Sequence, residues 1–109
     1  MAGISPEDRR TFERFSLKVG LRFLDLNSNR EGIGEGFDVS AKGIGMMTSA
    51  ALNPQVPLEM WVETLDKGTP LYTRGEVAWS RRVDTNKYRI GINLERADFM
   101  GISRLLRKM

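Results

Sequence analysis

The chain has 109 residues, of which 40% are hydrophobic and 28% charged, so it forms a single globular domain and disorder along its whole length is excluded. The formal net charge of +3 is mildly basic and only weakly favours an anionic partner. Cysteine and histidine are both absent, which excludes disulfides, thiolate metal sites, most zinc sites and the Ser-His-Asp and Cys-His catalytic groups.

Residues 1–14 are polar and show no apolar period, so we expect them to form a loosely held N-terminal arm. The arm contains three arginines, Arg9, Arg10 and Arg14, in the string RRTFER. Guanidinium groups bind phosphate oxygens and the O6/N7 edge of guanine through two parallel hydrogen bonds. An RxxxR spacing is common in basic proteins, so these arginines predict an anion site only in combination with other features.

Apolar residues alternate with polar ones from Leu17 to Phe23, which predicts a half-buried strand. A turn is expected at 27–29. The Gly-rich run 32–36 lacks the GxxxxGK[ST] pattern of a phosphate-binding loop, and we interpret it as a flexible hairpin leading into a weak second strand at Phe37 and Asp38.

The string DVSAKG at 38–43 combines a carboxylate, a hydroxyl and a glycine. Asp38 could accept hydrogen bonds from the N1–H and N2–H groups of guanine, and Ser40 could donate to a phosphate. Asp38 and Ser40 could equally form a local turn without any ligand. Gly43 could allow backbone to approach a ligand or could adopt a positive φ. Read together with the arginines, the string predicts a receptor for a guanine nucleotide that carries phosphate.

A third strand is expected at 43–48, followed by a loop around Pro54 and Pro57. Alternation then predicts strands at 58–62 and 71–79, joined by a hairpin at 66–68. This alternation places Trp79 in the core, whereas Trp61 could be either buried or available to stack a base.

The clearest alternation runs from Tyr88 to Leu94, after a turn at 84–87. Six strands at this spacing predict an all-β fold, a six-stranded antiparallel β-barrel of the Greek-key type formed by residues 15–109. The period then becomes helical from Asp98 onward, with late cations that suit a helix C-terminus. We expect a C-terminal α-helix that covers one end of the barrel or, alternatively, docks a partner.

Two pairs of carboxylates are candidates for catalytic groups. Glu31 and Glu35 fall in the Gly-rich run and are expected to be solvated, and Glu59 and Glu63 fall on the outward face of a strand. Neither pair has an apolar pocket that would raise one pKa, so we expect no enzymatic activity. No signal peptide and no long apolar run is visible, which, with the lack of cysteine, favours a cytoplasmic location.

Taken together, these motifs resemble the PilZ domain family. The resemblance rests on RxxxR at Arg10 and Arg14, with Arg9 just before it, and on DxSxxG at 38–43. The string GEVAW at 75–79 is similar to the family's GxVxW strand, and YRIGI at 88–92 is similar to its YxxGxxF strand. Leu94 replaces the Phe that the family often has at the end of that strand.

The resemblance implies a receptor for cyclic di-GMP with no further cofactor. The implied ligand-binding residues are Arg9, Arg10, Arg14, Asp38, Ser40 and Gly43. An arginine at the position of Arg9 implies two ligands per chain, bound as a stacked dimer. A monomer that signals through an unidentified partner protein is then expected. The alternatives are a PilZ-fold adaptor that binds only protein and, less favoured, a basic barrel that binds nucleic acid.

Overall fold

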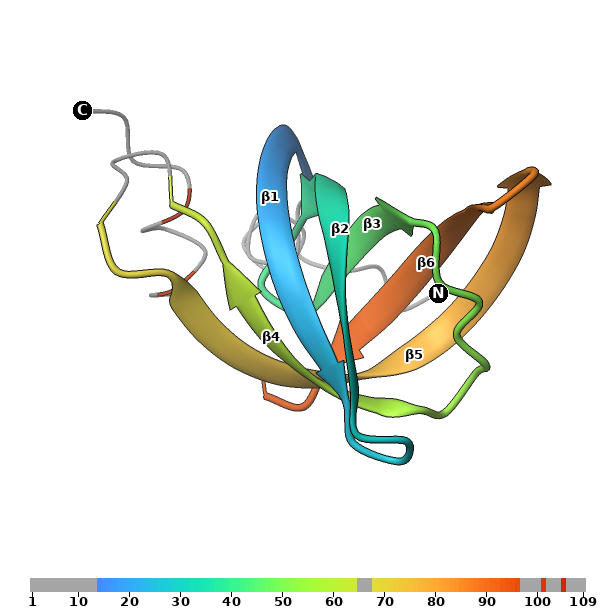
Figure 1. Cartoon of the computed structure of the whole chain (residues 1–109). Coiled ribbons are helices and arrows are strands. Elements are labelled where there is room, and N and C mark those ends of the chain that lie inside the picture. Colours follow the sequence, from blue (N-terminus) through green and yellow to red (C-terminus); the bar gives the residue numbers. More distant parts are fainter. Residues whose placement is uncertain (1–13, 65–67, 97–100, 102–104, 106–109) are drawn as a thin grey trace, which may run out of the picture.

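The computed structural model describes residues 14–64, 68–96, 101 and 105. In this part of the chain six antiparallel strands close into a barrel (Figure 1). The strands are β1 (Phe15–Asp25), β2 (Arg30–Val39), β3 (Gly43–Thr48), β4 (Pro57–Val62), β5 (Leu71–Asp84) and β6 (Lys87–Leu94). The predicted all-β barrel is therefore confirmed. The arm at 1–13 and nearly all of the predicted C-terminal helix lie outside the described residues.

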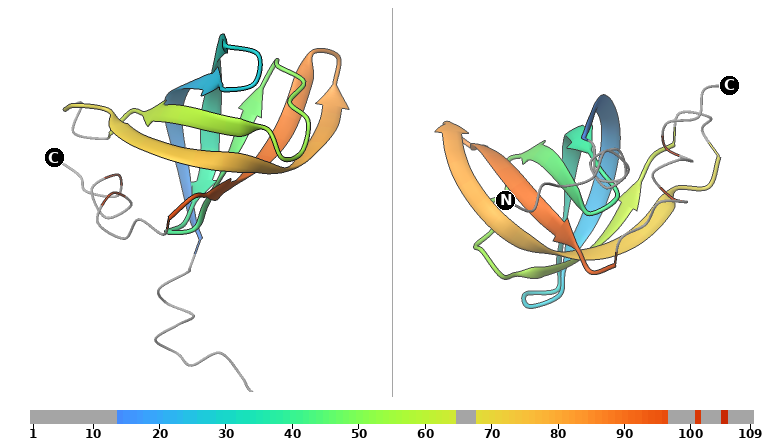
Figure 2. Two further views of the ribbon diagram at one scale, coloured as in Figure 1. Left: turned by 90° about the horizontal axis from the view of Figure 1, so that it is seen from below. Right: turned by 180° about the vertical axis from the view of Figure 1, so that it is seen from behind.

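Strand order around the barrel is β1-β2-β3-β6-β5-β4, and β4 pairs with β1 to close the ring. Strands β4, β5 and β6 follow one another as a meander, whereas β3 lies beside β6, so the link from β3 to β4 is a Greek-key connection (Figure 2). Closure leaves no free sheet edge. Within the described residues, no helix is both long and apolar enough to cross a membrane.

On β1, β4 and β6 the core is filled by the inward-facing residues that the alternation predicted. The fully buried side chains include Val39, Ile44, Met46, Leu58, Met60, Val62, Ile90 and Leu105. Val19, Leu21 and Phe23 supply the inward face of β1. Leu105 belongs to this cluster, so at least one residue of the C-terminal segment packs against the barrel.

The Gly-rich run is a regular part of β2, which corrects its interpretation as a flexible hairpin. Gly32 pairs with Phe23, and a Cβ added to Gly32 would lie 2.3 Å from Cζ of that ring. Gly36 pairs with Val19 in the same way, with its added Cβ 3.0 Å from Cγ2. The glycines therefore make room for the large core side chains of β1. Glu31 and Glu35 accordingly stand on a strand and not in a loop.

Trp79 is 44% exposed, so the prediction that it lies in the core is wrong. The cause is a β-bulge. Val77 pairs with Ile92, but Trp79 pairs with the next residue, Gly91, so Ala78 is an extra residue on β5. An extra residue reverses the inward and outward alternation of a strand. Trp79 consequently lies on the outer surface of the barrel.

Candidate functional site

Four residues form a row across four neighbouring strands. Asp38 on β2 pairs with Gly45 on β3, Gly45 pairs with Gly91 on β6, and Gly91 pairs with Trp79 on β5. Directly paired residues of a sheet point to the same face. The row therefore places a carboxylate and an indole on one outer face, separated by two residues without side chains.

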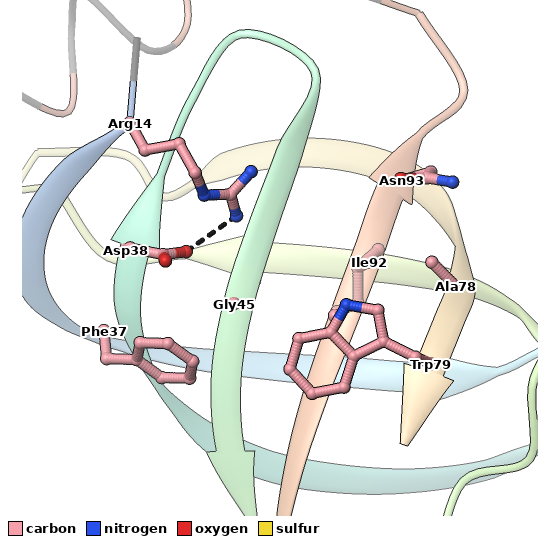
Figure 3. A pocket seen from close by; sticks show the side chains of 9 residues that line it. Arg14, Phe37, Asp38, Gly45, Ala78, Trp79, Ile92 and Asn93 are labelled. Carbon is pink, nitrogen blue, oxygen red and sulfur yellow. Dashed lines mark hydrogen bonds and ion pairs between the residues drawn. The ribbon is translucent and has the colours of Figure 1, made fainter. Parts of the chain in front are cut away.

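Two bulges create this arrangement. One lies in β2 between Gly36 and Asp38, where Phe37 is the extra residue, and the other is the bulge at Ala78. Bulges bend a strand and redirect its side chains. As a result, the two strands that flank the glycines each turn an aromatic ring to the outside, Phe37 on one side and Trp79 on the other (Figure 3).

The two glycines form the floor between the rings. An added Cβ at Gly45 would lie 2.6 Å from Oδ1 of Asp38 and 2.7 Å from Cζ of Phe37. An added Cβ at Gly91 would lie only 2.2 Å from Nε1 of Trp79. Any side chain at either position would displace the groups beside it. These glycines are required by close approach, because neither has a positive φ.

A pocket of about 270 Å³ opens above this floor. It is lined by Arg14, Phe37, Asp38, Gly45, Ala78, Trp79, Gly91, Ile92 and Asn93. Pockets for drug-sized ligands measure about 300–1,000 Å³. The volume therefore suits one planar ring system better than a whole dinucleotide.

Arg14, just before β1, reaches to Asp38 on the neighbouring strand β2, on the same side of the pocket (Figure 3). Its Nη2 donates a hydrogen bond of 2.7 Å to Oδ1, and the Arg14 side chain is still 51% exposed. A guanidinium has five N–H donors, so this bond leaves others available to a phosphate. Asp38 is 28% exposed and likewise keeps acceptor capacity.

Ser40 is buried and turned away from the pocket. Its Oγ accepts hydrogen bonds from the backbone N–H groups of Lys42, at 3.3 Å, and Gly43, at 3.1 Å. Its own N–H donates to the carbonyl of Gly43 at 2.8 Å. Ser40 therefore builds the tight connection from β2 to β3 that follows Asp38, which is the turn alternative named above.

Gly43 acts through close packing and not through a positive φ, since no described glycine has one. An added Cβ would lie 2.9 Å from the carbonyl oxygen of Ile92 on β6 and 3.6 Å from Nη1 of Arg14. Gly43 thus allows β3 and β6 to pair closely at the rim of the pocket. Its contribution to the site is the path of the backbone.

We predict that Ser40→Ala lowers the free energy of unfolding by about 1–3 kcal/mol, because the buried N–H of Gly43 and the partly buried N–H of Lys42 lose their acceptor. Urea denaturation measures this loss. Ser28→Ala is the matched control, since the Ser28 hydroxyl accepts a hydrogen bond from Arg30 N–H in an exposed turn. A Ser40→Ala protein of unchanged stability would contradict the structural role.

The structure brings together Arg14, Asp38 and Gly43 of the predicted site, and it places Ser40 behind them. Arg9 and Arg10 lie outside the described residues. The sequence reasoning missed the remaining pocket residues, chiefly Phe37, Gly45, Trp79, Gly91 and Asn93. Glycines at the outward positions of β3 and β6 were the available signal, because isolated strand glycines often mark close approach. Among the described residues, no group of three acidic side chains could hold a metal ion.

Comparison with known proteins agrees with this fold. The family model described as PilZ domain matches residues 8–108. No curated protein matches the sequence significantly. Solved structures match at the level of the fold.

The PilZ domain with c-di-GMP of YcgR from Escherichia coli is 15% identical, with a TM-score of 0.65, covering 89% of this chain and 86% of that one. The PilZ domain of CeSA from a cellulose-synthesizing bacterium is 14% identical, with a TM-score of 0.63, covering 87% and 92%. The Bacillus subtilis inhibitor of motility, MotI/DgrA, is 14% identical, with a TM-score of 0.67 over 89% of this chain. This chain spans about half the length of that protein, 48%.

Proposed function

Because this chain belongs to the PilZ domain family, we propose that it is a cyclic di-GMP receptor that performs no chemistry on its ligand. The observation that carries the proposal is the pocket in which Arg14 and Asp38 meet beside the indole of Trp79. A guanidinium can bind the phosphate of a guanine nucleotide, a carboxylate can accept hydrogen bonds from the guanine N–H groups, and an aromatic ring can stack on the base. The similar domain of YcgR has been solved with c-di-GMP.

In this proposal one guanine of the ligand enters the pocket above Gly45 and Gly91. Asp38 accepts hydrogen bonds from its N1–H and N2–H groups. The ring of Trp79 offers a face on which the base stacks, an interaction worth about 1–3 kcal/mol per base. Glycine at the floor lets the Trp79 indole and the Asp38 carboxylate lie close against the strands, where both would face the base.

The two phosphates of the ligand carry a charge of −2, which the arginines neutralise. Arg14 supplies one guanidinium from the pocket wall, and Arg9 and Arg10 supply two more from the arm. The arm folds over the ligand and becomes ordered. Fixing each residue costs about 1–2 kcal/mol, so the charge-assisted contacts must exceed that sum.

The output of such a receptor is a changed surface and not a reaction product. The ordered arm, the ligand and the outer face of the barrel together form a surface that did not exist before binding. A partner protein that recognises only this surface converts the ligand concentration into a response.

We predict two ligands per chain, bound as a stacked dimer, because an arginine just before RxxxR, here Arg9, accompanies this stoichiometry in the PilZ family. Equilibrium dialysis with a saturating ligand concentration gives the ratio directly. Arg9→Ala is expected to lower it toward one. A ratio of one for the unmodified chain contradicts the prediction.

Thermal unfolding tests the proposed function against a panel of nucleotides. Cyclic di-GMP should raise Tm progressively with concentration, because only the folded chain binds it. GTP and cyclic di-AMP should shift Tm far less, because GTP is not a cyclic dinucleotide and cyclic di-AMP contains adenine in place of guanine. Equal shifts for all three would leave only a general anion site.

A further inference from the structure

The hairpin of β5 and β6 continues beyond Trp79 as a strongly basic element. Within residues 80–89, here called the basic hairpin, Arg81, Arg82, Lys87 and Arg89 are exposed, and Asp84 is the single acid. These cations lie outside the pocket that holds Arg14 and Asp38. The receptor function proposed above makes no use of them.

Two of these cations are forced together by the register of the sheet. Arg81 pairs directly with Arg89, and both are exposed. Like charges directly opposite on a sheet destabilise it. No ion pair among the described residues compensates them, whereas elsewhere on the barrel Arg74 lies 3.4 Å from Glu95 and Lys18 lies 4.0 Å from Glu35.

Exposed polar side chains on β1, β4 and the first half of β5 contact partners on neighbouring strands. Arg22 lies over the ring of Trp61 at 4.7 Å, and Tyr72 donates a hydrogen bond to Glu59, which raises the pKa of Tyr72. In the basic hairpin, Arg89 is held over the ring of Phe37 at 4.5 Å, and Arg82 Nε donates to the carbonyl of Asp84 at 3.3 Å. Neither contact neutralises a charge.

A hollow with a partly apolar lining opens at the basic hairpin. It has a volume of about 480 Å³ and is lined by Phe37, Met47, Val83, Asp84, Lys87 and Arg89. Val83 is 44% exposed, so its side chain is open to a ligand that enters the hollow. The lining therefore combines three apolar side chains with two cations and one carboxylate.

We propose that the basic hairpin is a docking surface for an acidic segment of a partner protein, with one aliphatic side chain of that segment in the hollow. Carboxylates of the segment would lie between Arg81 and Arg89 and relieve their repulsion, as charge complementarity requires. The apolar side chains in the lining and the carboxylate of Asp84 favour a peptide over nucleic acid, because nucleic-acid binders present a denser cationic field.

The position of the surface suits a partner that senses the ligand, a point that rests on the proposed function. Phe37 lines both the hollow and the pocket above Gly45 and Gly91. A segment seated in the hollow would therefore contact the ring that flanks the bound base. The charge and shape arguments hold without this link.

The test is an NMR titration of the isotopically labelled chain with a short capped peptide of glutamates around one leucine. The peptide should shift the backbone amides of Arg81, Val83, Lys87 and Arg89. Its affinity should fall at least about tenfold in the double variant Arg81→Gln/Lys87→Gln, because two charge contacts are lost. Arg89 is left unchanged because it also packs on Phe37. Replacing the leucine by serine should weaken binding at least about threefold, since the hollow loses its apolar occupant.

The matched control is Lys18→Gln/Arg30→Gln, which also removes one lysine and one arginine charge, but from exposed positions on β1 and β2. This control should bind the peptide with the affinity of the unmodified chain. Unshifted hairpin amides, or equal losses in both double variants, would overturn the docking surface. Tighter binding of a single-stranded oligonucleotide than of the peptide would overturn it in favour of nucleic acid. Cyclic di-GMP titrated into the same samples separates the two proposals, because neither double variant touches Arg14, Asp38 or Trp79.

Discussion

Replacing Arg14 by alanine is expected to weaken cyclic di-GMP binding at least about 30-fold, the equivalent of about 2 kcal/mol. Two effects oppose each other in this variant. Loss of the guanidinium removes a charged hydrogen-bond donor to phosphate, which costs about 2–5 kcal/mol. Loss of the ion pair frees Asp38 for guanine, but an exposed pair contributes only about 0–1 kcal/mol. The first effect is larger, so affinity falls. Arg10→Ala should cause a similar loss.

Two comparisons make this result specific to the site. Arg74→Ala removes an exposed arginine that pairs with Glu95 away from the pocket, and it should leave affinity unchanged. Arg14→Lys keeps the charge but loses the two-pronged geometry, so its affinity should fall between those of the other two proteins. If calorimetry gave the Arg14→Ala protein the same affinity for cyclic di-GMP as the unmodified chain, the proposed role of Arg14 in ligand binding would be wrong.

The second large effect is expected from the floor of the pocket. In Gly91→Ala the new methyl group and the indole of Trp79 cannot occupy the same space, because 2.2 Å separates the added Cβ from Nε1. The ring must leave its place, and stacking on the base is lost. We expect a loss of about 1–3 kcal/mol in binding, or about 5- to 150-fold, and the same loss in Trp79→Ala.

A double-mutant cycle tests the assumed mechanism. If Gly91→Ala acts by displacing Trp79, the Gly91→Ala/Trp79→Ala protein should bind no more weakly than Trp79→Ala alone. Gly20→Ala is a suitable control, since its added Cβ meets only the flexible carboxylate of Glu63, at 3.0 Å. Additive losses in the double variant would show that Gly91 matters for another reason.

Most of the barrel was predictable because its strands obey a period of two. The alternation in β1, β4 and β6 identified both the strands and their buried faces, since each strand buries one face and leaves the other more exposed over that stretch. The predicted third strand, 43–48, matches β3 in full.

The functional surface was only partly predictable, because it depends on interruptions of that period. Trp79 was assigned to the core since the alternation of β5 was continued through Val77, and nothing in the local sequence marks the extra residue Ala78. The Gly-rich run was likewise interpreted from its composition. The Gly-rich run pairs with Phe23 and neighbouring residues of β1. The large side chains of β1 leave room only for glycine opposite them, and the sequence of the run alone does not show this pairing.

The string DVSAKG at 38–43 was also predictable only in part. The sequence identified Asp38, Ser40 and Gly43 as a unit, and the structure separates their roles. Asp38 faces the pocket and bonds to Arg14, while Ser40 and Gly43 hold the turn that positions it. Spacing alone could not distinguish a ligand contact from a hydrogen bond to the backbone two or three residues away.

Isothermal titration calorimetry of the folded, unmodified chain with cyclic di-GMP tests the central claim most directly, with GTP and cyclic di-AMP titrated in parallel. We expect saturable heat for cyclic di-GMP alone, at two ligands per chain, with the affinity lowered at least about 30-fold in the Arg14→Ala protein. Absence of heat up to high micromolar ligand, from a chain whose folded state is verified, would contradict the receptor function and leave only the fold.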